Sequence, residues 1–282
     1  MRKTEKLLIL MAKTWILLVI VAALTGCARV SFEEASQMQK QGLLLNAAEA
    51  YSRFADRNPA DPKAPEALFR AAEIYAKEFQ VCSKAVPLYE RVARNYADAK
   101  PWHGLAKRGF FSCPNYFPLQ PGMKWVYGDA QTGGRNMKQS ALAKPGPGGI
   151  PVVETSIYAG KKLVTRITRT YTRKDWELTE KEKGTTHAVP ILKFPVSKGR
   201  TWTARRGPDT LIFTVENDNA TVKLRKAGRF TGCIKVRRQI KGMSAWIYEY
   251  YAPGVGRVLT SVGGPGFEHR NTELINYEKE GK

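Results

Sequence analysis

The sequence predicts an α+β fold in which N-terminal helical hairpins are followed by an antiparallel all-β barrel or sandwich. Over residues 31 to about 110, apolar side chains recur with the period of a helix; from Pro114 onward they alternate with polar ones, as in half-buried strands. The 282 residues, 43% of them hydrophobic, suffice for about two domains with a core. We expect a leader over residues 1–26, a helical domain over 27–113 and a β domain over 114–282.

The first 27 residues have the organisation of an export signal. Basic residues precede an apolar run from Trp15 to Ala23, which is too short to cross a bilayer as a helix. The next residues, Leu24-Thr25-Gly26-Cys27, resemble the lipobox of bacterial lipoproteins. The resemblance implies cleavage before Cys27 and a covalent lipid on Cys27, with acyl chains such as palmitate. An uncleaved hydrophobic stretch with an incidental cysteine is the alternative, and either Met1 or Met11 can be the start.

The same resemblance predicts a location. Three acyl chains exceed the single chain that gives only marginal anchoring, so the membrane is an expected partner through the lipid. Ala28 and Arg29 follow the cysteine, and no aspartate resembles the inner-membrane retention signal. In a bacterium with two membranes this favours the outer membrane, facing the periplasm, with the inner membrane as the alternative.

The helical region carries small and aromatic residues in the order typical of tetratricopeptide (TPR) repeats. Ala47, Tyr51, Phe54 and Pro59 lie at offsets that match the second helix of such a repeat. The packing residues of a second unit are Ala71, Tyr75, Ala85 and Tyr89. About 70 residues resemble a short version of the TPR region of BamD-like outer-membrane lipoproteins, which implies docking of a periplasmic or outer-membrane protein. A plain helical bundle, in which these residues only form core, is the alternative.

The second domain has the turn-punctuated, period-two pattern of an antiparallel β domain. The candidate strands are 124–128, 151–158, 163–172, 176–181, 211–215, 221–225, 233–241, 245–251, 257–262 and 272–277. Three stretches, 116–127, 227–236 and 250–256, resemble a family of uncharacterised bacterial lipoprotein β domains, and the resemblance supplies no catalytic residues. We expect Trp125, Tyr127, Tyr250 and Tyr251 to fill the core, with the lining of a cavity as the alternative.

The cysteines beyond the leader suggest one disulfide. A helix from about Lys84 to Tyr96, followed by an antiparallel helix of similar length, would bring Cys113 back toward Cys82. In an oxidising compartment that pair can form a disulfide. Two independent buried thiols are the alternative. Cys233 lies in an alternating strand, where we expect a small core residue.

The excess of positive charge is concentrated in the β domain. The chain carries a formal charge of +21, of which residues 114–282 contribute +15. Alternation places five basic residues on one outward face of adjacent strands: Lys223, Arg225, Lys235, Arg237 and Lys241. Anionic lipid, an acidic glycan or an acidic protein is the expected partner, and a merely solvated basic surface is the alternative. Nucleic acid is not expected, because the leader exports the chain and no recognition motif is present.

The sequence contains no recognisable catalytic or cofactor-binding motif. Its three histidines lie far apart, without ligand spacing, so we expect no metal and no cofactor beyond the lipid on Cys27. The sequence therefore predicts a non-enzymatic interaction or scaffold lipoprotein of the cell envelope, with helical hairpins for a protein partner and a basic β domain for anionic material. The alternative is a carrier that holds an apolar ligand inside the β domain. A filled β domain would favour the first, and a large apolar cavity the second.

Overall fold

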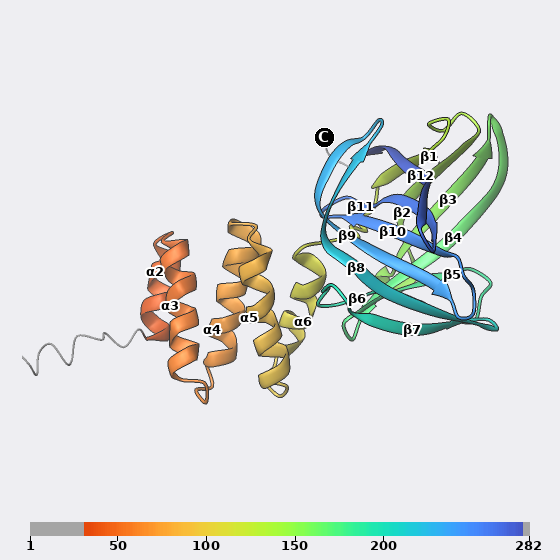
Figure 1. Cartoon of the computed structure of the whole chain (residues 1–282). Helices are drawn as coiled ribbons and strands as arrows, with labels where there is room; N and C mark the ends of the chain where they lie inside the picture. Colours follow the sequence, from red (N-terminus) through yellow and green to blue (C-terminus); the bar gives the residue numbers. More distant parts are fainter. Residues whose placement is uncertain (1–30, 279–282) are drawn as a thin grey trace, which may run out of the picture.

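One antiparallel sheet of 12 strands forms most of the structure, a computed structural model that describes residues 31–278 (Figure 1). The strands are β1 (Lys124–Asp129), β2 (Met137–Pro145), β3 (Pro151–Ala159), β4 (Lys162–Lys174), β5 (Glu177–Glu182), β6 (Val189–Lys193), β7 (Thr201–Arg206), β8 (Asp209–Leu224), β9 (Gly228–Ile240), β10 (Trp246–Ala252), β11 (Gly256–Gly264) and β12 (Phe267–Glu278). A single 3₁₀ turn, η2 (Pro147–Gly149), joins β2 to β3.

The sheet curls into a nearly closed barrel whose two edge strands are neighbours in the chain. The strand order is β6-β5-β4-β3-β2-β1-β12-β11-β10-β9-β8-β7, so the first and last strands are neighbours in the middle of the sheet. The two edge strands, β6 and β7, are consecutive in the chain. They are tied by a side chain, because the Trp202 indole Nε1 on β7 donates to the Pro190 carbonyl on β6 at 2.7 Å. A proline is tolerated on such an edge, where no ladder hydrogen bond is lost.

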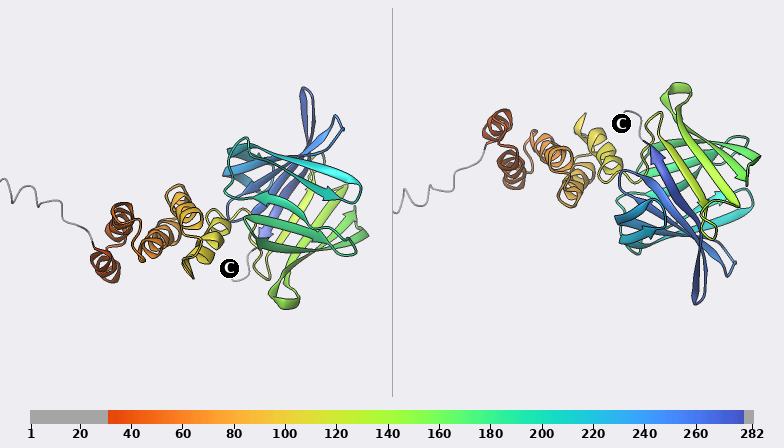
Figure 2. Two further views of the ribbon diagram at one scale, coloured as in Figure 1. Left: turned by 90° about the horizontal axis from the view of Figure 1, so that it is seen from below. Right: turned by 90° about the horizontal axis from the view of Figure 1, so that it is seen from above.

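Helices precede the barrel and form a row that leads away from it (Figures 1 and 2). They are α2 (Phe32–Lys40), α3 (Leu44–Arg57), α4 (Ala64–Glu73), the π-helical turn η1 (Ile74–Glu78), α5 (Cys82–Asn95) and α6 (Trp102–Ser112). Ser31 caps the first of them in a capping box with Glu34, which satisfies backbone N–H groups that a helix start leaves unpaired. Each helix packs on the next through alanines and aromatic rings, because small residues let the axes approach.

The predicted α+β fold class with TPR-like hairpins is wrong, and of the two β architectures considered the structure has a barrel and not a sandwich. In the described part of the chain the helices are short, 9 to 14 residues each, and the nearly closed 12-stranded barrel dominates. The pattern misled because any pair of short packed helices needs small and aromatic residues at helical spacing. Seven of the eight predicted packing residues are indeed buried, and Pro59 lies exposed in the turn after α3. The second unit departs from a regular repeat at the π-helical turn η1, between α4 and α5.

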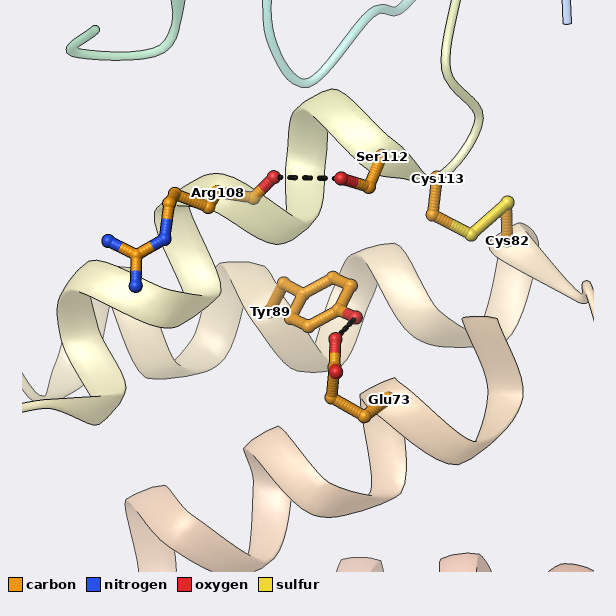
Figure 3. Close-up of a disulfide and its surroundings, with 6 residues drawn as sticks. All are labelled: Glu73, Cys82, Tyr89, Arg108, Ser112 and Cys113. Carbon is orange, nitrogen blue, oxygen red and sulfur yellow. Dashed lines mark hydrogen bonds between the residues drawn. A yellow bond between two sulfur atoms is a disulfide. The ribbon is translucent and has the colours of Figure 1, made fainter. Parts of the chain in front are cut away.

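The last helix joins the row to the barrel. The Phe110 ring lies 4.4 Å from the Trp176 ring, and the Phe111 ring lies 4.9 Å from the Phe194 ring, centroid to centroid. Just beyond α6, Cys113 forms a disulfide with Cys82 at the start of α5, with an S–S distance of 2.03 Å (Figure 3). Below the bond, the Tyr89 hydroxyl donates to the Glu73 carboxylate at 2.6 Å (Figure 3). The end of the helical row is therefore fixed by a covalent bond and by aromatic contacts to the barrel.

The leader and the lipidation residue Cys27 lie outside the described residues. Across residues 31–278, no helix combines the length and the apolar character needed to span a bilayer.

Candidate ligand-binding site

The barrel interior contains a cavity of about 120 Å³. Aromatic side chains form part of its wall: Phe117, Trp125, Tyr127, Tyr171 and Tyr251. Ionisable side chains form another part: Arg169, Glu180, Arg238, Glu249 and Arg257. Arginine and glutamate rarely point into a protein interior, because removing a charge from water is costly unless it is paired. Their presence makes this cavity the candidate functional site.

Strand alternation explains why these residues point inward. On β9, Arg238 shares a face with the fully buried Val236, two residues earlier. On β10, Glu249 and Tyr251 share the inward face, and Glu249 lies opposite Val236. A bulge between β10 and β11 then places Arg257 opposite Tyr251, so that these charged groups meet in one region.

Glu249 is the centre of the first polar cluster. Its side chain is only 5% exposed, and Arg257 Nη1 lies 3.2 Å from its Oε1. The Tyr251 hydroxyl donates to Oε2 at 3.2 Å, and Arg238 Nη2 lies 3.9 Å from Oε1. Burial raises the pKa of Glu249, but the two guanidinium groups and these hydrogen bonds outweigh it and hold the pKa below its usual value. The carboxylate is thus ionised and held in place.

A second polar cluster forms on β4 and β5. The Tyr171 hydroxyl donates to Glu180 Oε2 at 2.7 Å, and Arg169 Nη2 donates to Glu182 Oε2 at 2.8 Å. Burial, together with the Glu180 charge, raises the pKa of Tyr171 well above its usual value, so this hydroxyl stays a donor. Arg169 Nε is buried and makes no hydrogen bond within residues 31–278; the nearest carboxylate oxygen, on Glu180, is 3.5 Å away.

Two aromatic side chains of β1 are fixed against the cavity by backbone acceptors. The Trp125 indole Nε1 donates to the Val255 carbonyl at 2.7 Å, and the Tyr127 hydroxyl donates to the Arg257 carbonyl at 3.0 Å. Since the polar atoms of both side chains already form hydrogen bonds within the protein, the rings of Trp125 and Tyr127 offer apolar surface to the cavity. Burial raises the pKa of Tyr127 to about 12, which keeps the hydroxyl neutral.

A wider opening, here called the vestibule, lies beside the cavity. It has a volume of about 580 Å³ and is lined by the loop 184–187 together with Val189, Arg206, Gly207 and Leu211. Arg169, Glu180 and Arg238 line both the vestibule and the cavity. The vestibule and the cavity therefore adjoin at these three side chains.

The charged lining argues against an apolar ligand. The barrel interior is not filled, yet the cavity is much smaller than the several hundred Å³ of a typical apolar ligand site. A purely apolar molecule placed there would separate buried charges from water without replacing their hydrogen bonds. The cavity is better matched to a molecule that combines polar groups with a small apolar body.

The residues of the predicted cationic face are divided by the structure. Lys235 forms an ion pair with Glu268 at 2.6 Å, and Arg237 forms one with Glu216 at 2.9 Å. Lys223 and Arg225 instead line an open cleft with His269 and Arg270, while Lys241 lies exposed in a turn. Two of the five positive charges thus have acidic partners, and binding of anionic material to this face stays a prediction.

The predicted aromatic residues are also divided. Trp125, Tyr127 and Tyr251 line the cavity. Tyr250 points outward instead, where its hydroxyl donates to Glu268 at 2.6 Å.

The most distinctive site residues are ones that the sequence reasoning missed. Arg238 shares its strand face with Ile234, Val236 and Ile240, so a charged residue on an apolar face was a visible signal. The same rule places Glu249 on the face of Tyr251. Nothing in the sequence shows that Arg169 and Glu180 face the same cavity as Arg238 and Glu249. Their strands, β4 and β5, lie near one end of the strand order, and β9 and β10 lie near the other.

Comparisons with known proteins give limited matches. No protein-family model matches the sequence, and a comparison with curated proteins finds no relative. One similar solved structure is a protein from Bacteroides fragilis classed as exported, with a YmcC-like fold, at 15% identity and a TM-score of 0.41. Another is a protein from Parabacteroides distasonis classed as a lipoprotein, at 15% identity and a TM-score of 0.33. Each match covers 58% of this chain and 98% of the other. The resemblance to BamD-like TPR proteins is not shown.

The described residues also offer no metal centre. Within residues 31–278, no group of three or more histidine, cysteine, aspartate or glutamate side chains is arranged to hold an ion.

Proposed function

We propose that this chain is a non-enzymatic, lipid-anchored binding protein of the bacterial cell envelope, and that its barrel holds a small ligand with polar and apolar parts. One observation carries the proposal: a hollow barrel whose aromatic and charged lining opens to a vestibule. Ligand sites of this kind combine apolar walls with a few placed polar groups.

The state of the charged groups favours binding over catalysis. A general acid or base works best with a pKa near the operating pH. Burial raises the pKa of Glu249 and the two neighbouring arginines lower it. The lowering is the larger effect, so the pKa is below its usual value. Such a carboxylate is a fixed hydrogen-bond acceptor and a poor proton shuttle, so its role in the proposal is to position arginine side chains.

The proposed anchor is the lipid on Cys27, and the proposed location is the outer membrane, facing the periplasm. The Cys82–Cys113 disulfide supports export, because such bonds persist in oxidising compartments. The row of helices begins far from the barrel, at the end of the chain that carries Cys27 (Figure 1). In the proposal the helices therefore act as a spacer between the membrane and the barrel.

Changing the proposed lipid acceptor should release the protein from the membrane. The Cys27→Ser variant lacks the thiol that accepts the lipid, so we expect it in the soluble fraction after cell lysis, while the wild-type protein sediments with membranes. Fractionation followed by immunoblotting measures this. A Cys233→Ser variant is the control, because Cys233 is a buried free thiol and should not affect anchoring. Equal sedimentation of the Cys27 variant and the wild type would argue against the anchor.

Filling the cavity should expel the ligand. Thr155 lines the cavity, so Thr155→Trp would occupy a large part of its 120 Å³. Native mass spectrometry of protein isolated from its own envelope should show a bound small molecule in the wild type, and a loss of most of it in this variant. The neighbouring Ser156 points to the opposite face of β3, so Ser156→Trp should keep the ligand. Wild-type protein without any bound molecule would contradict the proposal.

A further inference from the structure

Of the three arginines that line the cavity, Arg169 and Arg257 each donate a hydrogen bond to a carboxylate, and Arg238 does not. Within residues 31–278 its side chain donates no hydrogen bond, and its nearest carboxylate oxygen, Glu249 Oε1, is 3.9 Å away. That oxygen is already 3.2 Å from Arg257 Nη1. The Arg238 side chain is 22% exposed, and it lines both the cavity and the vestibule. A guanidinium group has five N–H donors in a planar fork, so this one offers unfilled hydrogen-bonding capacity to a ligand.

The local charge around Arg238 is positive. Glu249 is shared between Arg257 and Arg238, which leaves one excess positive charge in this corner of the cavity. On β4 and β5, which share this lining, Arg169 faces two carboxylates, Glu180 and Glu182. Although Arg169 Nε is also unpaired, these two negative charges would repel an anion there. The Arg238 corner is therefore the place where an anionic group is favoured.

The carboxylates at the cavity and the vestibule each accept at least one hydrogen bond from the protein. Glu249 accepts from Arg257 and Tyr251, Glu180 accepts from Tyr171, and Glu182 accepts from Arg169. Since the Arg238 guanidinium has donors without partners, a ligand that binds it well must bring acceptors. Two oxygens of one carboxylate match the guanidinium fork in a bidentate pair, which is stronger and more directional than a neutral hydrogen bond.

We propose that the ligand of the barrel carries a carboxylate that binds the Arg238 guanidinium. This inference rests on the proposed ligand-binding function and names the chemical class of the ligand. The rings of Trp125, Tyr127 and Tyr251 provide the surface against which its apolar body packs. A volume of about 120 Å³ has room for roughly eight to twelve waters, since each needs about 10–15 Å³ in this measure. The body inside the cavity is therefore small, of the size of one aromatic ring.

Calorimetric titration of the full-length protein with benzoate and benzamide tests the inference. The two molecules have nearly the same shape, and only benzoate carries the charge. We expect benzoate to bind about tenfold or more tightly than benzamide, the factor given by a charge-assisted hydrogen bond of about 1.5–3 kcal/mol. Arg238→Gln should remove this preference. Arg237→Gln is the matched control, because Arg237 is the adjacent arginine on the outer face and is paired with Glu216.

A second variant separates a lost contact from a lost fold. Arg238→Lys keeps the charge without the fork, so it should retain a weakened preference for benzoate, and circular dichroism checks that each variant is folded. Equal binding of the two ligands, or benzoate binding that survives in folded Arg238→Gln, would overturn the carboxylate assignment and leave the ligand-binding function standing. Binding of neither probe to the wild type would overturn the carboxylate assignment, while the ligand-binding function is decided by the native mass spectrometry described above.

Discussion

Replacing Glu249 with glutamine is expected to destabilise the barrel by about 3 kcal/mol, because it leaves buried arginine charges without their counter-charge. Glu249 is 5% exposed, and the Arg257 guanidinium lies 3.2 Å from it. Glutamine keeps the size and one acceptor oxygen, so the change removes charge and little packing. For a domain of this size the loss corresponds to a fall in melting temperature of about 6–12 °C. Urea unfolding followed by tryptophan fluorescence measures it.

The control for this variant is Glu216→Gln. Glu216 pairs with Arg237 at 2.9 Å on the outer face, where its side chain is 34% exposed. Ion pairs that water reaches contribute about 0–1 kcal/mol, so this variant should unfold close to the wild type. Equal losses in the two variants would mean that the inner pair contributes no more than a surface pair.

Acid should narrow the difference between wild type and Glu249→Gln. The pKa of Glu249 is below its usual value in the folded protein, because the pull of Arg238 and Arg257 outweighs burial. A carboxyl group whose pKa is lower in the folded state than in the unfolded state stabilises the fold. This stabilisation is fully present above the unfolded-state pKa, about 4.3, and is lost as the pH falls through the folded-state pKa. The two proteins should therefore differ most near neutral pH and progressively less below about pH 4. If the difference in stability between the two proteins instead grows as the pH falls, the pKa of Glu249 is not lowered in the folded protein.

The sequence predicted the strands in which large apolar and polar residues alternate. It missed strands built around alanine or containing proline. Strand β9 alternates Ile234 and Val236 with basic residues, and its prediction as a strand agrees with the structure. In contrast, β2 presents Ala141 and Ala143 to the interior, and alanine is a weak strand former, so no strand was expected there. Strand β6 contains a proline, which breaks the usual pattern.

The site was harder to predict than the strands because it depends on closure of the sheet. Six strands lie between β4, which carries Arg169, and β9, which carries Arg238, in the sheet order, and the near-closure at β6 and β7 brings the two residues to one interior. Alternation identifies which residues point inward, yet it does not show whether the interior is packed or hollow. The charged residues on apolar faces were the available clue, since an unpaired charge in a packed core would be too costly.

Removing the disulfide is expected to destabilise the helical row by about 3–4 kcal/mol. The bond joins Cys82 and Cys113 across 31 residues, and a closed loop of that length restricts the unfolded chain by roughly this free energy. The bond also fixes the end of α6 beside the contacts that attach it to the barrel, among them Phe110 against Trp176. In a Cys82→Ser/Cys113→Ser variant the helical signal at 222 nm should therefore be lost at a lower temperature than in the wild type.

A reductant separates the contribution of the bond from the effect of the substitutions. Reduction should lower the melting temperature of the wild type toward that of the double variant, and it should leave the double variant unchanged. Cys233 supplies no second redox effect, because it is buried and free, and burial raises the pKa of its thiol to about 11. If reduction leaves the wild-type helical transition unchanged, noncovalent contacts such as Phe110 against Trp176 and Lys107 with Asp175 are sufficient, and the bond is not what stabilises the helical row.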